Sequence, residues 1–195
     1  MRSSPIIGLC VIGAFALTAC GGAAASSPAA TPSSTPDRSV QVGATFGTDP
    51  GDVAITYDPA LVPVGARAAV SSETGDDGTV VMLAVRGLQP DRRYGAHAHV
   101  EACGDTGDAA GPHFQNEVDP VQPSVDPAYA NPQNEIWLDL TTDSAGAGNA
   151  TADVEWGFDR DRRAKSVIIH EMGTATAPGE AGKAGARPAC INVEF

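Results

Sequence analysis

Residues 80–100 read VVMLAVRGLQPDRRYGAHAHV. Within this stretch Val80–Leu88 and Tyr94–Val100 are short runs that are apolar or alternate with polar residues, and Pro90-Asp91 marks a turn between them. A period of two is typical of a β-strand with one face in a core. The stretch therefore predicts two strands joined by a short connection.

The same pattern continues on both sides of this stretch, from about Asp52 to the C-terminus. Six further runs lie between breakers rich in Gly, Pro and Asp: Val53–Tyr57, Ala66–Ser71, Glu135–Thr142, Ala150–Phe158, Ser166–Glu171 and Ala189–Val193. Eight short strands with such turns predict an all-β antiparallel sandwich or barrel. Residues 101–134 and 172–188 lack a strand pattern, and loops that long inside a compact domain usually carry function.

The first 48 residues differ in kind from the rest. A basic start is followed by an uncharged, mostly apolar run and by Leu17-Thr18-Ala19-Cys20, which resembles a bacterial lipobox. We expect a lipoprotein signal peptide over residues 1–19 and lipid attachment at Cys20, the alternative being an ordinary secretory signal. Residues 20–48 are rich in Ala, Ser, Thr, Pro and Gly, which predicts a flexible tether. The β domain would then span residues 49–195, anchored to the outer face of a bacterial cytoplasmic membrane.

The charge of the chain restricts its partners. With 12 Lys+Arg and 24 Asp+Glu the net charge is −12, and loss of Arg2 with the signal peptide leaves 11 − 24 = −13. This balance argues against nucleic acid and against adsorption to anionic membranes through basic residues. Hydrophobic residues make up 42%, which is enough for a core. No stripe of residues indicates an interface, so the sequence leaves the oligomeric state open.

Histidines and cysteines are the residues that carry chemistry. His97 and His99 are two apart on one predicted strand, so their imidazoles share a face, while His113 lies in a loop and His170 near the end of a strand. Four imidazoles suit Cu, Zn, Fe or Ni, although the residues alone leave open that the histidines are incidental. Cys103 and Cys190 would remain in an exported chain and by default pair, the alternative being two free buried thiols.

Several motifs occur in an order that resembles the copper–zinc superoxide dismutase family over residues 52–195. They are Gly87-Leu88-Gln89-Pro90, Tyr94–His99, Gly111-Pro112-His113-Phe114, Ile168-Ile169-His170-Glu171 and Gly185–Cys190. The resemblance implies an eight-stranded, immunoglobulin-like Greek-key β-barrel or sandwich that converts superoxide to dioxygen and hydrogen peroxide. It also implies copper ligands at His97, His99, His113 and His170, a Cys103–Cys190 disulfide, an active-site arginine at Arg187, and His113 as a proton carrier.

The sequence departs from this family at the zinc site. No histidine lies between His113 and His170, so a zinc site of the family type cannot form, and one copper ion per chain is expected. We hypothesise that Glu135 accepts a hydrogen bond from His113 in place of zinc; the alternative is a solvated strand-end charge. The short segment between His170 and Arg187 predicts an open site. The alternative function is a copper-binding or copper-carrier lipoprotein without turnover.

Overall fold

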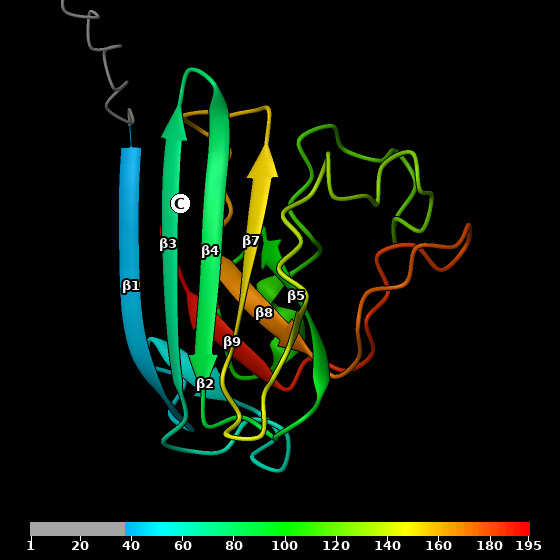
Figure 1. Ribbon diagram of the computed structural model, residues 1–195. Helices are drawn as coiled ribbons and strands as arrows, with labels where there is room; N and C mark the ends of the chain where they lie inside the picture. The colour runs from blue at the N-terminus through cyan, green and yellow to red at the C-terminus, as the bar shows by residue number, and fades with distance from the viewer. Residues whose placement is uncertain (1–37) are drawn as a thin grey trace, which may run out of the picture. The chain divides into compact units, whose positions relative to one another are not determined.

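The computed structural model describes residues 38–195 (Figure 1). The predicted signal peptide, Cys20 and most of the predicted tether lie outside the described residues. Within the described part, none of the helical structure has the length and apolar character needed to cross a membrane.

The described chain is all-β, as predicted. Its strands are β1 (Arg38–Gly47), β2 (Ala54–Thr56), β3 (Arg67–Gly75), β4 (Gly78–Arg86), β5 (Arg93–His99), β6 (Leu140–Thr141), β7 (Gly148–Val154), β8 (Ser166–His170) and β9 (Ala189–Asn192), with one 3₁₀ turn, η1 (Gly107–Ala110). They form a sheet in the order β6-β5-β8-β9-β2-β1-β3-β4-β7, and β6 and β7 contact each other, so the barrel is nearly closed. The pairs β4–β7 and β5–β8 join strands far apart in sequence, as in a Greek key.

The predicted tether of residues 20–48 is wrong over its last part, because residues 38–47 form β1. β1 pairs antiparallel with β3 from Arg38 to Thr45, and its alternate residues Val40, Val42 and Phe46 pack on the core. Ser39, Gln41, Gly43 and Thr45 alternate with them and are exposed, so a composition typical of a tether conceals a strand of period two. The domain therefore begins no later than Arg38 and has nine strands rather than eight.

The run predicted as one strand over Glu135–Thr142 is a regular strand only at its end. Leu140–Thr141 forms β6, whereas the preceding residues make isolated bridges, Gln115 with Glu135 and His97 with Trp137. The alternation nevertheless holds, since Ile136 and Leu138 are buried in the core. Glu135, Trp137 and Asp139 alternate with these two residues and therefore point away from the core.

The two long loops lie on the same side of the barrel, held there by a disulfide and by a close contact at a glycine of β5. Figure 1 shows the segment after β5 (green) and the segment after β8 (orange) both projecting on the side of β5 and β8. The predicted disulfide between Cys103 and Cys190 is present and joins the first loop to β9. Gly95 on β5 also lies against the second loop, where an added Cβ would stand 2.7 Å from the Met172 carbonyl oxygen.

Candidate metal centre

The four histidines predicted as copper ligands come together. One nitrogen atom of each of His97, His99, His113 and His170 lies within 4.8 Å of the corresponding atoms of the others. β5 and β8 pair so that Gly95 lies opposite His170, which sets the third imidazole beside the two on β5. His113 joins them because it bridges to His99 from the first long loop. The period of two on β5 thus produces the cluster, while Ala96 and Ala98 face the core.

Burial keeps three of these rings neutral. His97 and His99 are fully buried and His170 is 3% exposed. Burial lowers the pKa of His97 and His99 well below the ordinary value, with the neighbouring imidazoles as further causes, and lowers the pKa of His170 to about 3. Neutral imidazole is the form that binds a metal ion, so the cluster is ready to accept one.

In His99 and His113, hydrogen bonds determine which ring nitrogen carries the proton and which is left free for a metal ion. His99 Nδ1 lies 2.9 Å from the Gly111 carbonyl oxygen, and His113 Nδ1 lies 2.7 Å from Glu135 Oε2. Both partners are acceptors, so each Nδ1 carries the proton and each Nε2 is left with a lone pair. His99 Nε2 lies 3.4 Å from His170 Nε2, which puts these two atoms at the centre of the group.

Glu135 makes the contact hypothesised from the sequence. Its side chain is 1% exposed, which rules out a solvated strand-end charge. Its Oε2 accepts from His113 Nδ1 and from Trp137 Nε1, both at 2.7 Å, and its Oε1 accepts from Gln115 Nε2 at 2.8 Å. Three donors satisfy this buried carboxylate and fix the His113 ring.

Arg187 is tied to the same carbonyl group as a histidine of the cluster. Its Nη1 donates to the Gly111 oxygen at 2.7 Å and to the Gly107 oxygen at 3.2 Å. Gly107 has to be glycine, because an added Cβ would lie 2.7 Å from the Arg187 carbonyl oxygen. Burial lowers the pKa of Arg187, with Asp108 opposing that shift, but a guanidinium stays protonated in proteins.

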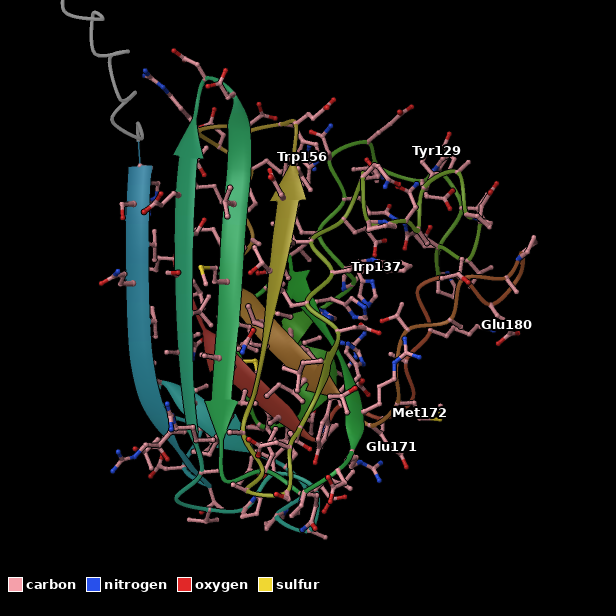
Figure 2. The ribbon with its side chains drawn as sticks, in the orientation of Figure 1. Tyr129, Trp137, Trp156, Glu171, Met172 and Glu180 are labelled. Atoms are coloured by element: carbon pink, nitrogen blue, oxygen red, sulfur yellow. A yellow bond between two sulfur atoms is a disulfide. The ribbon has the colours of Figure 1, made fainter. Side chains whose placement is uncertain are left out.

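An open cleft gives access to the cluster. Its lining includes His113, His170, Arg187, Lys183, Glu180 and Met172. Figure 2 shows Met172 and Glu180 along the second long loop, with Tyr129 on the first and Trp137 nearer the barrel. His113 is the one member of the cluster with appreciable exposure, 15% of its side chain. A small anion entering this cleft would therefore meet both Arg187 and His113.

Two polar residues at the site were not predicted from the sequence. Thr174 Oγ1 lies 2.7 Å from His97 Nε2, and the same hydroxyl donates to Asp139 Oδ1. Asp139 shares the parity of Glu135 and Trp137 in the run Glu135–Thr142, and that alternation was the signal that could have placed it beside the histidines. Thr174 lies in a loop, where no periodicity marks it.

Comparisons with known proteins give a likeness in structure. No family model and no curated protein matches the sequence. The Cu/Zn superoxide dismutase from Brucella abortus superposes with a TM-score of 0.54 at 18% identity, covering 79% of this chain and 99% of that one. A double mutant of a superoxide-dismutase-like protein from Bacillus subtilis gives a TM-score of 0.50 at 17% identity, covering 64% and 87%. The chain therefore has the Greek-key β-barrel fold of the Cu/Zn superoxide dismutases, with four histidines grouped as a metal site requires.

Proposed function

We propose that this protein is a copper-dependent superoxide dismutase that holds one copper ion and no zinc. The observation that carries the proposal is the group of four histidine nitrogens within 4.8 Å of one another. Two of these histidines, His113 and His170, line a cleft that Arg187 also lines. The reaction takes two superoxide ions and two protons to one dioxygen and one hydrogen peroxide. Activity, metal and substrate are inferred from this site and from the named activity of a protein with the same fold.

The donor set fits copper. Four imidazoles without thiolate or thioether are ligands for either oxidation state of copper, although zinc, iron and nickel also accept imidazole. His97, His99, His113 and His170 would hold the ion. When bound, copper would supply the one-electron chemistry of both half-reactions, while the protein delivers the anion and the protons.

Arg187 would attract the substrate. The chain from Cys20 onward carries a net charge of −13, which repels an anion at long range. A fixed cation in the cleft makes the local potential attractive to an anion. The two carbonyl groups that accept hydrogen bonds from Arg187 hold its side chain in place. We assign Arg187 the role of guiding superoxide to the cluster.

His113 would carry protons. It is the most exposed ring of the four and lines the cleft. Its Nδ1 is held by Glu135, so Nε2 is the atom that can take up a proton and pass it to a product oxygen. Glu135 would occupy the structural place that zinc has in the two-metal members of the family, since it fixes the second nitrogen of His113.

The decisive experiment is a metal analysis combined with an assay of superoxide loss. We expect the purified protein, offered copper and zinc together, to retain one copper and no zinc per chain and to remove superoxide only when copper is bound. Copper retention without turnover would favour the alternative, a copper carrier. Retention of zinc at the four histidines, with copper excluded, would contradict the proposal.

Substitution of Arg187 tests the guidance of the substrate. Arg187→Ala should retain copper but lower the rate about tenfold at low ionic strength, because cationic guidance raises association rates by at least that factor. The fall of the rate with added salt should largely disappear. Arg86→Ala removes the same charge from an exposed position on β4 and serves as the control. An unchanged rate and salt dependence in Arg187→Ala would remove this residue from the mechanism.

We further propose that the protein is exported and anchored through Cys20 to the outer face of the cytoplasmic membrane. The support is the order of basic start, apolar run and Leu17-Thr18-Ala19-Cys20. Feeding cells an alkyne-tagged fatty acid should label the wild-type protein and leave Cys20→Ser unlabelled. Equal labelling of the two would rule out this anchor.

A further inference from the structure

A methionine side chain lies at the entrance to the histidine cluster. Met172 follows β8 by two residues (Figure 2) and lines the same cleft as His170 and Arg187. We infer that Met172 is a transient ligand for Cu(I), at which the ion enters the cleft before the buried imidazoles bind it. The inference rests on the proposed copper site, but it does not require that the site turns over superoxide.

Most of the imidazoles that would hold the ion are shielded from solvent. His97 and His99 are fully buried, and His170 is 3% exposed. Met172, by contrast, is 54% exposed while it lines the cleft that leads to the cluster. An ion arriving from solvent can therefore contact this methionine before it reaches three of the four rings.

The carboxylates of the cleft are already engaged. Glu180 lines the cleft, but its Oε1 accepts from Lys183 Nζ at 2.9 Å. Glu135 is enclosed by its three hydrogen-bond donors. Among the described residues that line the cleft, no carboxylate is therefore left without a partner to take up a metal ion. Met172 supplies the sulfur atom of this lining, since the cysteines of the described domain are joined in the disulfide.

The chemistry of a thioether and the charge of the cleft both favour the monovalent ion. Soft sulfur ligands select Cu(I), and imidazole also binds copper, so the ion can pass from one ligand to the other. Arg187 and Lys183 place two positive charges in the cleft. Because Coulomb repulsion grows with the charge of the ion, Cu(I) approaches these cations more easily than Cu(II) does. A cleft that attracts superoxide thus admits the metal more readily as Cu(I).

The backbone of Met172 is held in place beside the cluster. Its N–H donates to the Ala184 carbonyl oxygen at 2.8 Å, and its own carbonyl oxygen accepts from the Gly95 N–H of β5 at 2.7 Å. The side chain lies over Gly185, where an added Cβ would stand 2.9 Å from Met172 Cε. A methionine side chain has three rotatable bonds, so the sulfur can turn between solvent and cleft while the Cα atom stays beside β5.

The transfer is a ligand exchange and needs no electron. A lone pair of the Met172 sulfur forms a bond to Cu(I) as a ligand of the incoming copper complex leaves. An imidazole nitrogen of the cluster then forms its bond to the ion, and the copper–sulfur bond breaks. Met172 is regenerated unchanged and is absent from the final ligand set. Its substitution should therefore change the rate of copper uptake and leave the final affinity unaltered.

The test compares Met172→Leu with Met82→Leu. Leucine has a similar volume to methionine, so both variants should keep the fold. Met82 is 50% exposed on β4 and is the matched control. Metal-free Met172→Leu, mixed with the coloured bicinchoninate complex of Cu(I), should take up the ion about tenfold more slowly than wild type, which corresponds to about 1.4 kcal/mol in the barrier. The copper bound at equilibrium should equal that of wild type, and Met82→Leu should load at the wild-type rate.

Two further measurements separate binding by sulfur from a change in the shape of the cleft. Uptake of Cu(II) from its glycine complex should have the same rate in wild type and Met172→Leu, because the harder divalent ion gains little from a thioether. The second measurement needs no variant. In wild-type protein labelled with ¹³C at the methionine methyl groups, Ag(I), a soft monovalent ion, should shift the Met172 signal at lower concentration than the Met82 signal.

Several outcomes would overturn the inference. They are Cu(I) uptake by Met172→Leu at the wild-type rate, equal slowing in the two variants, Cu(II) uptake slowed as much as Cu(I) uptake, and an Ag(I) titration that moves both methionine signals together. A wild type that takes up no Cu(I) would overturn this inference and the proposed function alike. Dismutase activity is not a readout here, so a wild type that loads copper without removing superoxide would contradict the proposed function and leave this inference standing.

Discussion

Replacing Cys103 and Cys190 together by alanine should lower the free energy of unfolding by about 4–5 kcal/mol. The two residues are 87 positions apart, so their disulfide closes a long loop and removes much of the freedom of the unfolded chain. Alanine is preferred to serine because Cys190 is fully buried, where a hydroxyl would lack a partner. Urea titrations of wild type and variant at pH 7 measure the difference.

The same substitution should loosen the first long loop, whose Gly107 carbonyl group holds the substrate-guiding Arg187. Cys103 N donates to Asn192 Oδ1 at 2.9 Å, and the next residue, Gly104, accepts from the Tyr57 hydroxyl at 2.8 Å. Arg187 reaches this loop through the Gly107 carbonyl. Hydrogen exchange around residues 103–111 should therefore rise in the variant more than exchange in β3 and β4. A stability change under about 1 kcal/mol in the double variant would contradict the loop argument.

The histidine cluster could be predicted because each member is marked by its local sequence. His97 and His99 share a strand face by the period of two, and His170 closes an apolar run that has to be a buried strand. The same alternation explains how Glu135 reaches His113 although its run is not a regular strand. The sequence therefore predicts the position of a site residue wherever the alternation within its own strand decides which face it occupies.

What could not be predicted depends on contacts between distant segments. Thr174 meets Asp139 across 35 positions, and nothing local to either residue indicates the other. β1 was missed for a different reason: its outward residues are small and polar like those of a tether, and only its pairing with β3 makes them a strand. Amino-acid composition indicates how much apolar surface a segment could bury by itself. β1 instead buries its apolar face against the rest of the domain.

The metal-free protein should lose about 3 kcal/mol of stability when the pH falls from 6.5 to 5.5. Folding lowers the pKa of His97 and His99 well below the unfolded value of 6.5, and that of His170 to about 3. As the pH falls below 6.5, the unfolded chain takes up protons that the folded chain refuses, so stability is present above this pH and is lost below it. Each histidine contributes about 1 kcal/mol over the first pH unit.

The slope, rather than the stability at one pH, identifies the histidines as the cause. Asp and Glu side chains titrate mostly below pH 5, so the interval from 6.5 to 5.5 isolates imidazole. His170→Gln should reduce the slope by about a third even if it alters the absolute stability, because one of three groups with a lowered pKa is gone. Copper should raise the stability at every pH without changing what these three rings contribute to the slope, because they are already unprotonated in the metal-free fold. Urea titrations at closely spaced pH values measure these slopes, and a flat profile for the metal-free wild type would mean that the buried rings are not held neutral.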